Sequence, residues 1–238
     1  MLSSKKELKK SLKNSLRDLV VVILGIFIGV QVDNLKDNIL SIKKERTILS
    51  QIEHSLLQDI NDMDFNIKGH TLALKSDSLL LFYIENKLIF RKELIYHFPK
   101  PLLDFVLITN TGAYETLKSI GMDLIRDDSL RLCIAELYDF YYEKLNKFEE
   151  EFYPAQSYNR FFKYFSINFK MYNIPSNTRS SVNNSSAYPI NYDKLINDPE
   201  YQILLQEDIL WRKVILDRYF TMKKKASSLI SKIRKELS

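Results

Sequence analysis

The hydrophobic pattern begins with an unbroken apolar segment near the N-terminus. Residues 19–32 (LVVVILGIFIGVQV) carry no charge, and Gln31 is their only strongly polar side chain. Fourteen helical residues span about 21 Å, which is less than the roughly 30 Å hydrocarbon core of a bilayer. The flanking leucines extend the apolar length to about 20 residues if Lys13 and Arg17 snorkel. We therefore predict a transmembrane helix over residues 18–35.

Two other interpretations follow from the length of this segment. A core of this size also fits a cleaved signal peptide or a buried helix of a soluble domain. The basic run before the segment is typical of a cytoplasmic flank, and no small-x-small cleavage site follows it. These two features favour an uncleaved anchor.

Helical periodicity continues beyond the predicted span. No Gly or Pro lies between Gly29 and Gly69, and apolar residues recur there every seven positions. They are Leu35, Ile42, Leu49, Leu56 and Met63. This pattern predicts one amphipathic helix over about residues 30–68. Because Arg46 and Glu53 interrupt the seam, packing on its own domain is favoured over a pure coiled coil.

The middle of the chain predicts shorter helices separated by Gly and Pro. We expect a second helix over about residues 71–96 and a third over about 102–120, which ends at Gly121. One of the three residues 127–129 can cap the next helix, whose apolar face continues to Pro154. The region after the span, residues 36–238, is therefore predicted to be a helical domain.

The C-terminal region combines a polar loop with a long helix. Residues 174–190 are rich in Ser and Asn and predict a loop, whereas the Asn-Asp-Pro run 197–199 can start a helix over 198–237. The seam of this helix alternates steps of four and three, as in coiled coils. Its members are Trp211, Ile215, Tyr219, Met222, Ala226, Leu229 and Ile233. Antiparallel packing on the helix over 30–68 would bring its Lys-rich end back toward the membrane.

Composition supports an all-α class. The 238 residues include only five Gly and six Pro, too few for the turns of a β-sandwich or barrel. A hydrophobic content of 45% is enough to build a packed core, and a single Cys excludes a disulfide framework.

The net charge of +5 is unevenly distributed. Residues 1–17 and residues 222–238 each carry +5, so the region between them is acidic. We expect contacts with anionic lipid headgroups from both basic ends. The residues concerned are Lys5, Lys6, Lys9, Lys10, Lys13, Arg17, Lys223, Lys224 and Lys225. For the C-terminal lysines, a solvated end that complements the helix dipole is an equal alternative. Six basic residues precede the span and four follow it closely, which favours a cytoplasmic N-terminus with the body on the opposite side.

Small and polar residues within and just after the span indicate self-association. Gly25 and Gly29 form a GxxxG step that Asp33 continues, and Gln31 and Asn34 lie near its exit. Glycine at this spacing lets two helices approach closely in lipid, and polar side chains can hydrogen-bond across the contact. We expect a homo-oligomer. A polar lumen or a chance Gly pair are the alternatives.

Aromatic residues are concentrated at residues 138–172, where fourteen of thirty-five are Tyr or Phe. The favoured interpretation is a packed core, and the alternative is a membrane-facing or partner-binding surface. Nucleic-acid binding is excluded because the charge of this region is balanced, whereas phosphate contacts need excess Lys and Arg.

No arrangement of residues predicts catalysis, a metal or a cofactor. The three His are isolated, and phosphate-loop, dinucleotide and nucleophile-elbow motifs are missing. Asp59, Asp62, Asn66 and His70 share one helical face, for which we expect solvent exposure rather than metal binding. Cys133 is interpreted as a small core residue.

Three patches, at residues 18–35, 112–131 and 197–205, resemble an uncharacterised family of small bacterial single-pass membrane proteins that share a domain of unknown function. Members of that family open with a basic stretch and one short span that ends in a Gln-x-Asn-Asn-like turn. Here Asp33 replaces the first Asn, and Leu35 replaces the usual Trp. The resemblance implies a helix-rich membrane protein and supplies no catalytic residue.

Together these features predict a membrane-anchored helical scaffold or sensor-like interaction protein without catalytic activity. An oligomeric channel or membrane-disrupting effector, with Gln31 and Asn34 lining its lumen, is the alternative.

Overall fold

The computed structural model describes residues 2–172 and 185–238, with side chains from residue 19 onward. Apart from connecting segments, these residues form helices and two strands of three residues each, so the expected all-α class is confirmed. The chain divides into two units, Met1–Leu49 and Ser50–Ser238. The division falls later than the predicted boundary at residue 35, and the side chains of residues 36–40 are still exposed.

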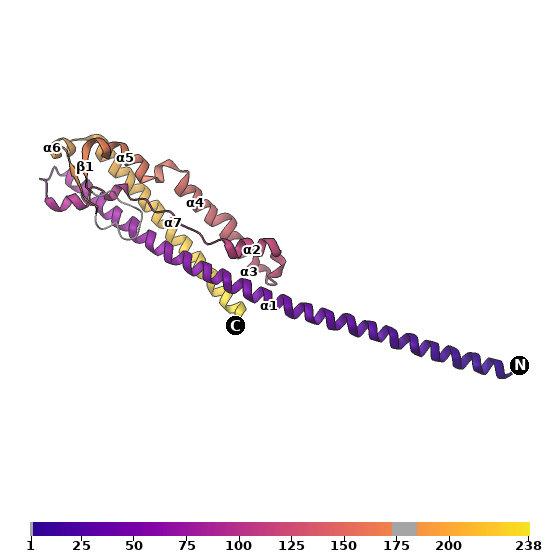
Figure 1. The fold of residues 1–238 in the computed structure, drawn as a ribbon. Helices are drawn as coiled ribbons and strands as arrows, with labels where there is room; N and C mark the ends of the chain where they lie inside the picture. The colour runs from indigo at the N-terminus through magenta and orange to yellow at the C-terminus, as the bar shows by residue number, and fades with distance from the viewer. Residues whose placement is uncertain (1, 173–184) are drawn as a thin grey trace. The chain divides into compact units, whose positions relative to one another are not determined.

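Two long helices begin and end the chain, α1 (Leu2–Glu85) and α7 (Pro199–Leu237) (Figure 1). The other α-helices are α2 (Gly112–Ile120), α3 (Asp128–Ala135), α4 (Glu143–Glu150), α5 (Ser157–Asn168) and α6 (Tyr192–Leu195). A π-helical stretch, η4 (Glu136–Tyr142), joins α3 to α4 without a break. Short 3-10 helices are η1 (Lys92–Tyr96), η2 (Lys100–Leu102), η3 (Met122–Leu124) and η5 (Tyr153–Ala155).

The helix α1 passes through Gly69 without a break, so the predicted separate helices over 30–68 and 71–96 are wrong. A Cβ at Gly69 would overlap the Phe105 ring, which packs directly on the helix at this point. The glycine therefore permits a close approach instead of ending the helix. The first helix ends only at Glu85.

The helix predicted over residues 102–120 is also wrong in its first half. Residues 103–111 form neither helix nor strand and run as an extended segment up to Thr111, which has helical dihedrals, and α2 starts only at Gly112 (Figure 1). The predicted C-cap is correct, because Gly121 follows α2 with a φ of 121° that favours glycine. The extended segment lacks a strand partner in the described structure, so its peptide groups need other hydrogen-bond partners.

The polar loop predicted over 174–190 is too long at its C-terminal end. Residues 187–189 form strand β2 (Ala187–Pro189), which pairs antiparallel with β1 (Phe169–Met171). Ala187 is buried in the core, and this burial favours the strand over a solvated loop. Residues 173–184 lie outside the described part of the chain.

Two helix starts were placed correctly from sequence. Asp127 caps α3 by accepting a hydrogen bond from the Leu130 N–H at 2.8 Å. Asp198 caps α7 by accepting one from the Glu200 N–H at 2.9 Å, and Pro199 occupies the first turn.

Within Ser50–Ser238, α7 runs antiparallel along α1 (Figure 1). Side-chain contacts pair Glu53 with Arg234, Asp64 with Lys223, Asn66 with Tyr219 and Asp77 with Arg212. The predicted seam of α7 is buried from Ile215 to Ile233, whereas Trp211 is only half-buried.

The aromatic region divides between core and surface. Its buried members are Tyr138, Tyr142, Phe161, Tyr164, Phe165 and Phe169. Phe165 stacks on Phe169 with ring centroids 4.4 Å apart, and Tyr164 stacks on Tyr201 of α7. Its exposed members are Phe140, Phe152, Tyr153, Phe162 and Tyr172. The core interpretation therefore holds for the first set only.

Candidate functional site

The apolar segment of α1 exposes its side chains on every side of the helix. The large apolar residues of 19–32 are between 48 and 64% exposed. By length and composition, α1 is the one helix in the described chain that could cross a membrane. A helix that is apolar all round normally lies in a large protein core or in a bilayer.

The residues proposed for self-association lie on this exposed helix. A Cβ added at Gly25 or Gly29 would meet no atom within 4 Å, so both positions are open to a second helix. Gln31, Asp33 and Asn34 are exposed as well. Self-association itself stays a prediction.

The cations proposed for lipid contact differ in their surroundings. Lys223 donates to Asp64 at 2.5 Å, and Lys225 lies 3.6 Å from the centre of the Tyr141 ring. Lys224 is exposed. The side chains of the six N-terminal cations, from Lys5 to Arg17, lie outside the described set.

A row of polar side chains is buried on the face of α1 that packs on the body. Asp59, Asn66 and His70 are each at most 2% exposed, so the solvated face expected for them is wrong. The row continues to Asp77, which is fully buried. Buried polar groups require hydrogen-bond partners. Asn110 of segment 103–111 donates to Asp59, whereas α7 supplies Tyr219 to Asn66 and Arg212 to Asp77.

Carboxylates bind the backbone of the extended segment 103–111 directly. Glu149 of α4 accepts from the Leu107 N–H at 3.1 Å. On α1, Asp62 accepts from the Ile108 N–H at 3.2 Å, and Asp59 accepts from the Asn110 N–H at 2.9 Å. The Tyr142 hydroxyl also donates to Asp59, at 2.9 Å. These side chains replace the ladder partners that a β-sheet would provide.

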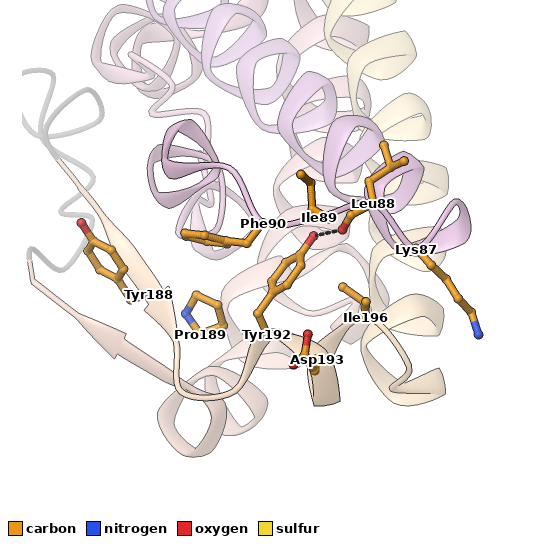
Figure 2. A pocket seen from close by; sticks show the side chains of 9 residues that line it. All are labelled: Lys87, Leu88, Ile89, Phe90, Tyr188, Pro189, Tyr192, Asp193 and Ile196. Carbon is orange, nitrogen blue, oxygen red and sulfur yellow. Dashed lines mark hydrogen bonds between the residues drawn. The ribbon is translucent and has the colours of Figure 1, made fainter.

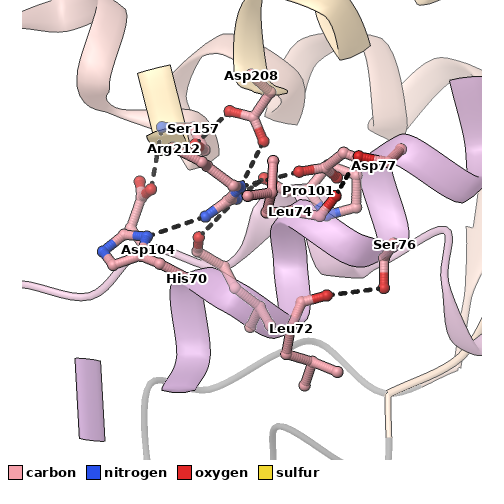
Figure 3. Close-up of polar contacts among 12 residues, drawn as sticks. His70, Leu72, Leu74, Ser76, Asp77, Pro101, Asp104, Ser157, Asp208 and Arg212 are labelled. Carbon is pink, nitrogen blue, oxygen red and sulfur yellow. Dashed lines mark hydrogen bonds and ion pairs between the residues drawn. The ribbon is translucent and has the colours of Figure 1, made fainter. Parts of the chain in front are cut away.

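Arg212 of α7 lies at the centre of a buried charge cluster (Figure 3). Its Nε donates to Asp208 at 2.7 Å and to Asp77 of α1 at 3.0 Å. Its Nη2 donates to the carbonyls of Pro101 and Leu103, at 3.1 and 2.9 Å. One guanidinium therefore joins α1, α7 and the start of the extended segment.

Further groups complete the cluster. Asp208 also accepts hydrogen bonds from Arg160 and from the Ser157 hydroxyl. Asp104 accepts from the Ser157 and Tyr158 N–H groups at 3.0 and 2.9 Å, which caps the first turn of α5. Nδ1 of His70 lies 3.2 Å from Arg212.

Burial and neighbouring charges set the protonation of the buried groups. Burial, followed by the Arg212 charge, lowers the pKa of His70 to about 3, so this imidazole is neutral. Burial and the nearby Asp208 carboxylate raise the pKa of Asp77 well above its usual range. Burial would also raise the pKa of Asp208, but Arg212 and Arg160 outweigh it and the pKa is lowered. The cluster thus holds Asp208 as the anionic partner of Arg212.

Arg212, Asp208 and Asp77 are not among the site residues that the sequence predicts. On α7, Asp208 and Arg212 continue the seam of Ile215 and Tyr219 at steps of four and three residues. On α1, Asp77 lies seven residues after His70, on the same face. The apolar pattern places Trp211 in the seam, but the neighbouring Arg212 is the buried residue. A polar residue at the helical spacing of an apolar seam is the sequence signal that could have predicted these buried positions.

A pocket of about 580 Å³ lies near the C-terminal end of α1 (Figure 2). It is lined by Lys87, Leu88, Ile89, Phe90, Tyr188, Pro189, Tyr192, Asp193 and Ile196. The Tyr192 hydroxyl donates to the Leu88 carbonyl at 2.8 Å, and its ring packs edge-on against Phe90. Lys87 and Asp193 are the charged groups of the pocket.

We also searched the described residues for metal-binding clusters and for a nucleophilic cysteine. They contain no group of three or more His, Cys, Asp and Glu arranged for a metal ion. Cys133 is half-buried rather than a core residue, and Lys232 Nζ lies 2.9 Å from its sulfur.

Comparison of this chain with protein-family models, with curated proteins and with solved structures gave no match.

Proposed function

We propose that this protein is a membrane-anchored helical scaffold or sensor-like interaction protein that self-associates through its span and has no catalytic activity. The observation that carries the proposal is the exposure of apolar side chains around the whole circumference of α1 at residues 19–32. Burial of apolar surface is favourable by about 25 cal/mol per Å². A lipid bilayer can cover every side of such a helix at once.

The body has features that suit an interaction protein. Buried ion pairs fix α7 against α1 in one register, which makes the body a defined frame for binding surfaces. The exposed aromatic residues of 138–172 are of the types enriched at protein interfaces. We propose that a protein partner binds at this region.

We propose that the N-terminus is cytoplasmic and the body is on the opposite side of the membrane. The support is the excess of Lys and Arg before the span over those shortly after it.

Membrane extraction of the full chain tests the anchor. The wild-type protein should stay in the pellet after alkaline carbonate treatment and float with liposomes. The double variant Ile23→Lys/Phe27→Lys should become extractable, since each lysine at a span centre costs about 2.5–3.5 kcal/mol. The matched control Ile23→Leu/Phe27→Leu should behave as wild type. Extraction of the wild-type chain in soluble form would refute the anchor.

The single cysteine reports the orientation. Cys133 lies in the body and is half-buried, so a membrane-impermeant maleimide can test its side of the membrane. Labelling of intact cells is the expected result, and detergent-permeabilised cells give the intrinsic reactivity. Labelling only after permeabilisation would place the body in the cytoplasm.

A further inference from the structure

A groove runs along the junction of α7 with η4 and its flanking helices. Two adjoining cavities of about 130 and 200 Å³ form it, and they share Tyr141 and Lys225. Buried Leu137, Leu145 and Leu229 contribute to its apolar floor. The groove lies on the surface of the body and is separate from the buried charge cluster.

Four cations line this groove, and each contacts an aromatic ring or a thiol. Lys225 lies 3.6 Å from the centre of the Tyr141 ring, and Arg218 lies 3.8 Å from that of Phe148. Lys144 is 5.5 Å from the centre of the Phe140 ring. Lys232 donates to the Cys133 sulfur.

Two other cations on the same helices are paired with carboxylates. Lys147 lies 2.8 Å from Glu143, and Lys223 lies 2.5 Å from Asp64. The four groove cations make no such ion pair with any described residue, although Glu136 and Asp217 also line the groove. The Nε of Arg218 is buried and has no acceptor among the described residues. The groove therefore carries four cations against two acids, and none of the four cations forms an ion pair with a described residue.

We propose that this groove binds a phosphate-bearing anion. Lys144, Arg218 and Lys225 line the larger cavity and would hold the phosphate group. Lys225 and Lys232 extend the site into the smaller cavity. Arginine and lysine are the usual partners of phosphate, and an apolar floor strengthens their attraction by lowering the local dielectric constant.

The helix geometry supports a ligand that reaches along α7. Arg218, Lys225 and Lys232 follow one another at intervals of seven residues, which brings them to the same face. Two turns of helix separate successive cations by about 10 Å. The inference depends on contacts within the body alone and stands independently of the proposed membrane anchor.

Titration of the full chain with inorganic pyrophosphate tests the site. We use the protein in neutral phosphatidylcholine nanodiscs at physiological ionic strength and measure binding by calorimetry. The double variant Arg218→Gln/Lys225→Gln should weaken the affinity at least about tenfold. The control Lys118→Gln/Lys147→Gln removes the same charge from ion-paired exposed positions and should change it less than about twofold.

A second variant keeps the test decisive if the first one folds poorly. Glu136→Gln/Asp217→Asn removes the two acids that line the groove and should tighten pyrophosphate binding by about threefold or more. Absence of binding by the wild-type protein overturns the proposal. Equal losses in the groove variant and in the control also overturn it, because binding would then follow net charge alone.

Nanodiscs that contain phosphatidylglycerol distinguish the two sources of phosphate. If lipid headgroups occupy the groove, these discs should weaken pyrophosphate binding by the wild type and by the Lys118→Gln/Lys147→Gln control alike. Equal affinity in both kinds of disc assigns the site to a soluble phosphate compound. Either result supports a phosphate site, and the two differ only in its source.

Discussion

Two regions of α1 reverse the usual distribution of side chains. At residues 19–32 the apolar side chains are exposed, whereas at residues 59–77 acidic, amide and imidazole side chains are buried. Each arrangement has a physical cause outside the helix. The first region lacks a protein surface to cover it, and the second faces an extended segment with unpaired peptide groups. Side-chain type alone therefore does not indicate which face of this helix is inside.

The comparison also explains why the body needs its buried charges. A buried ion pair is costly to desolvate and often adds little to stability by itself. Here Arg212 additionally binds two backbone carbonyls, and Asp59, Asp62 and Glu149 bind backbone N–H groups. The polar residues thus complete the hydrogen bonding of a segment that has no sheet to join.

Among the substitutions considered, removal of Arg212 should destabilise the folded body most. Arg212→Met should lower the free energy of unfolding by about 3–5 kcal/mol, because it removes the donor to Asp77 and to two carbonyls and one of the donors to Asp208. Urea denaturation of the full chain in detergent, followed by tryptophan fluorescence, measures the loss. Arg234→Met, which removes the exposed ion pair with Glu53, should cost no more than about 1 kcal/mol. Equal losses in both variants would contradict a central role for Arg212.

The carboxyl group of Glu149 should make stability depend on pH. Burial raises its pKa from 4.5 to about 7, so between these values the folded state binds a proton that the unfolded state has released. Stability from this group is therefore fully present below pH 4.5, falls as the pH rises toward 7, and is constant above that. Over this range the wild type should lose roughly 3 kcal/mol more than Glu149→Gln.

Denaturation at a series of pH values measures this difference. His70 has the opposite sign, because its pKa is lowered and its contribution grows as the pH rises from about 3 through 6.5. His70 is present in both proteins, so its effect cancels in the comparison. Parallel pH profiles for wild type and Glu149→Gln would show that Glu149 does not titrate differently on folding.

Gly69 tests the close approach within the buried region. Gly69→Ala should destabilise the protein by about 1–3 kcal/mol, because the added methyl group displaces the buried Phe105 ring. Helix propensity alone predicts the opposite sign, because alanine is favoured over glycine within a helix by about 1 kcal/mol. Gly112→Ala is the matched control, since a Cβ there meets nothing within 4 Å. A stabilising effect of Gly69→Ala would show that the ring moves freely.

The glycines of the exposed region should show a smaller and different effect. Gly25→Leu/Gly29→Leu should leave the body's stability unchanged and reduce the oligomer size, because the bulky side chains prevent close helix approach in lipid. Mass measurement in nanodiscs distinguishes the species. Val22→Leu/Ile26→Leu is the control and should keep the wild-type size. An unchanged oligomer in the glycine variant would remove the span as the assembly interface.

The sequence predicted those parts of the fold that depend on local signals. The Asp127 and Asp198 caps, the Gly121 C-cap and the seam of α7 from Ile215 to Ile233 all follow from short-range patterns. The prediction that the helix ends near Gly69 is wrong, because this glycine makes room for the Phe105 ring, which is distant in the chain. The prediction that Asp59, Asn66 and His70 are exposed to solvent is wrong because the residues that cover them are also distant in the chain.

The sequence by itself determined the helical class, the apolar segment and the two long periodic helices, because each depends on spacing within about one or two turns. Only the tertiary structure decided which polar residues are inside and which cations gather at the groove. Those properties depend on contacts between residues such as Asp77 and Arg212, which are 135 positions apart. A local sequence pattern cannot specify a hydrogen-bond partner at that separation. The partner is specified by how the extended segment packs between the helices.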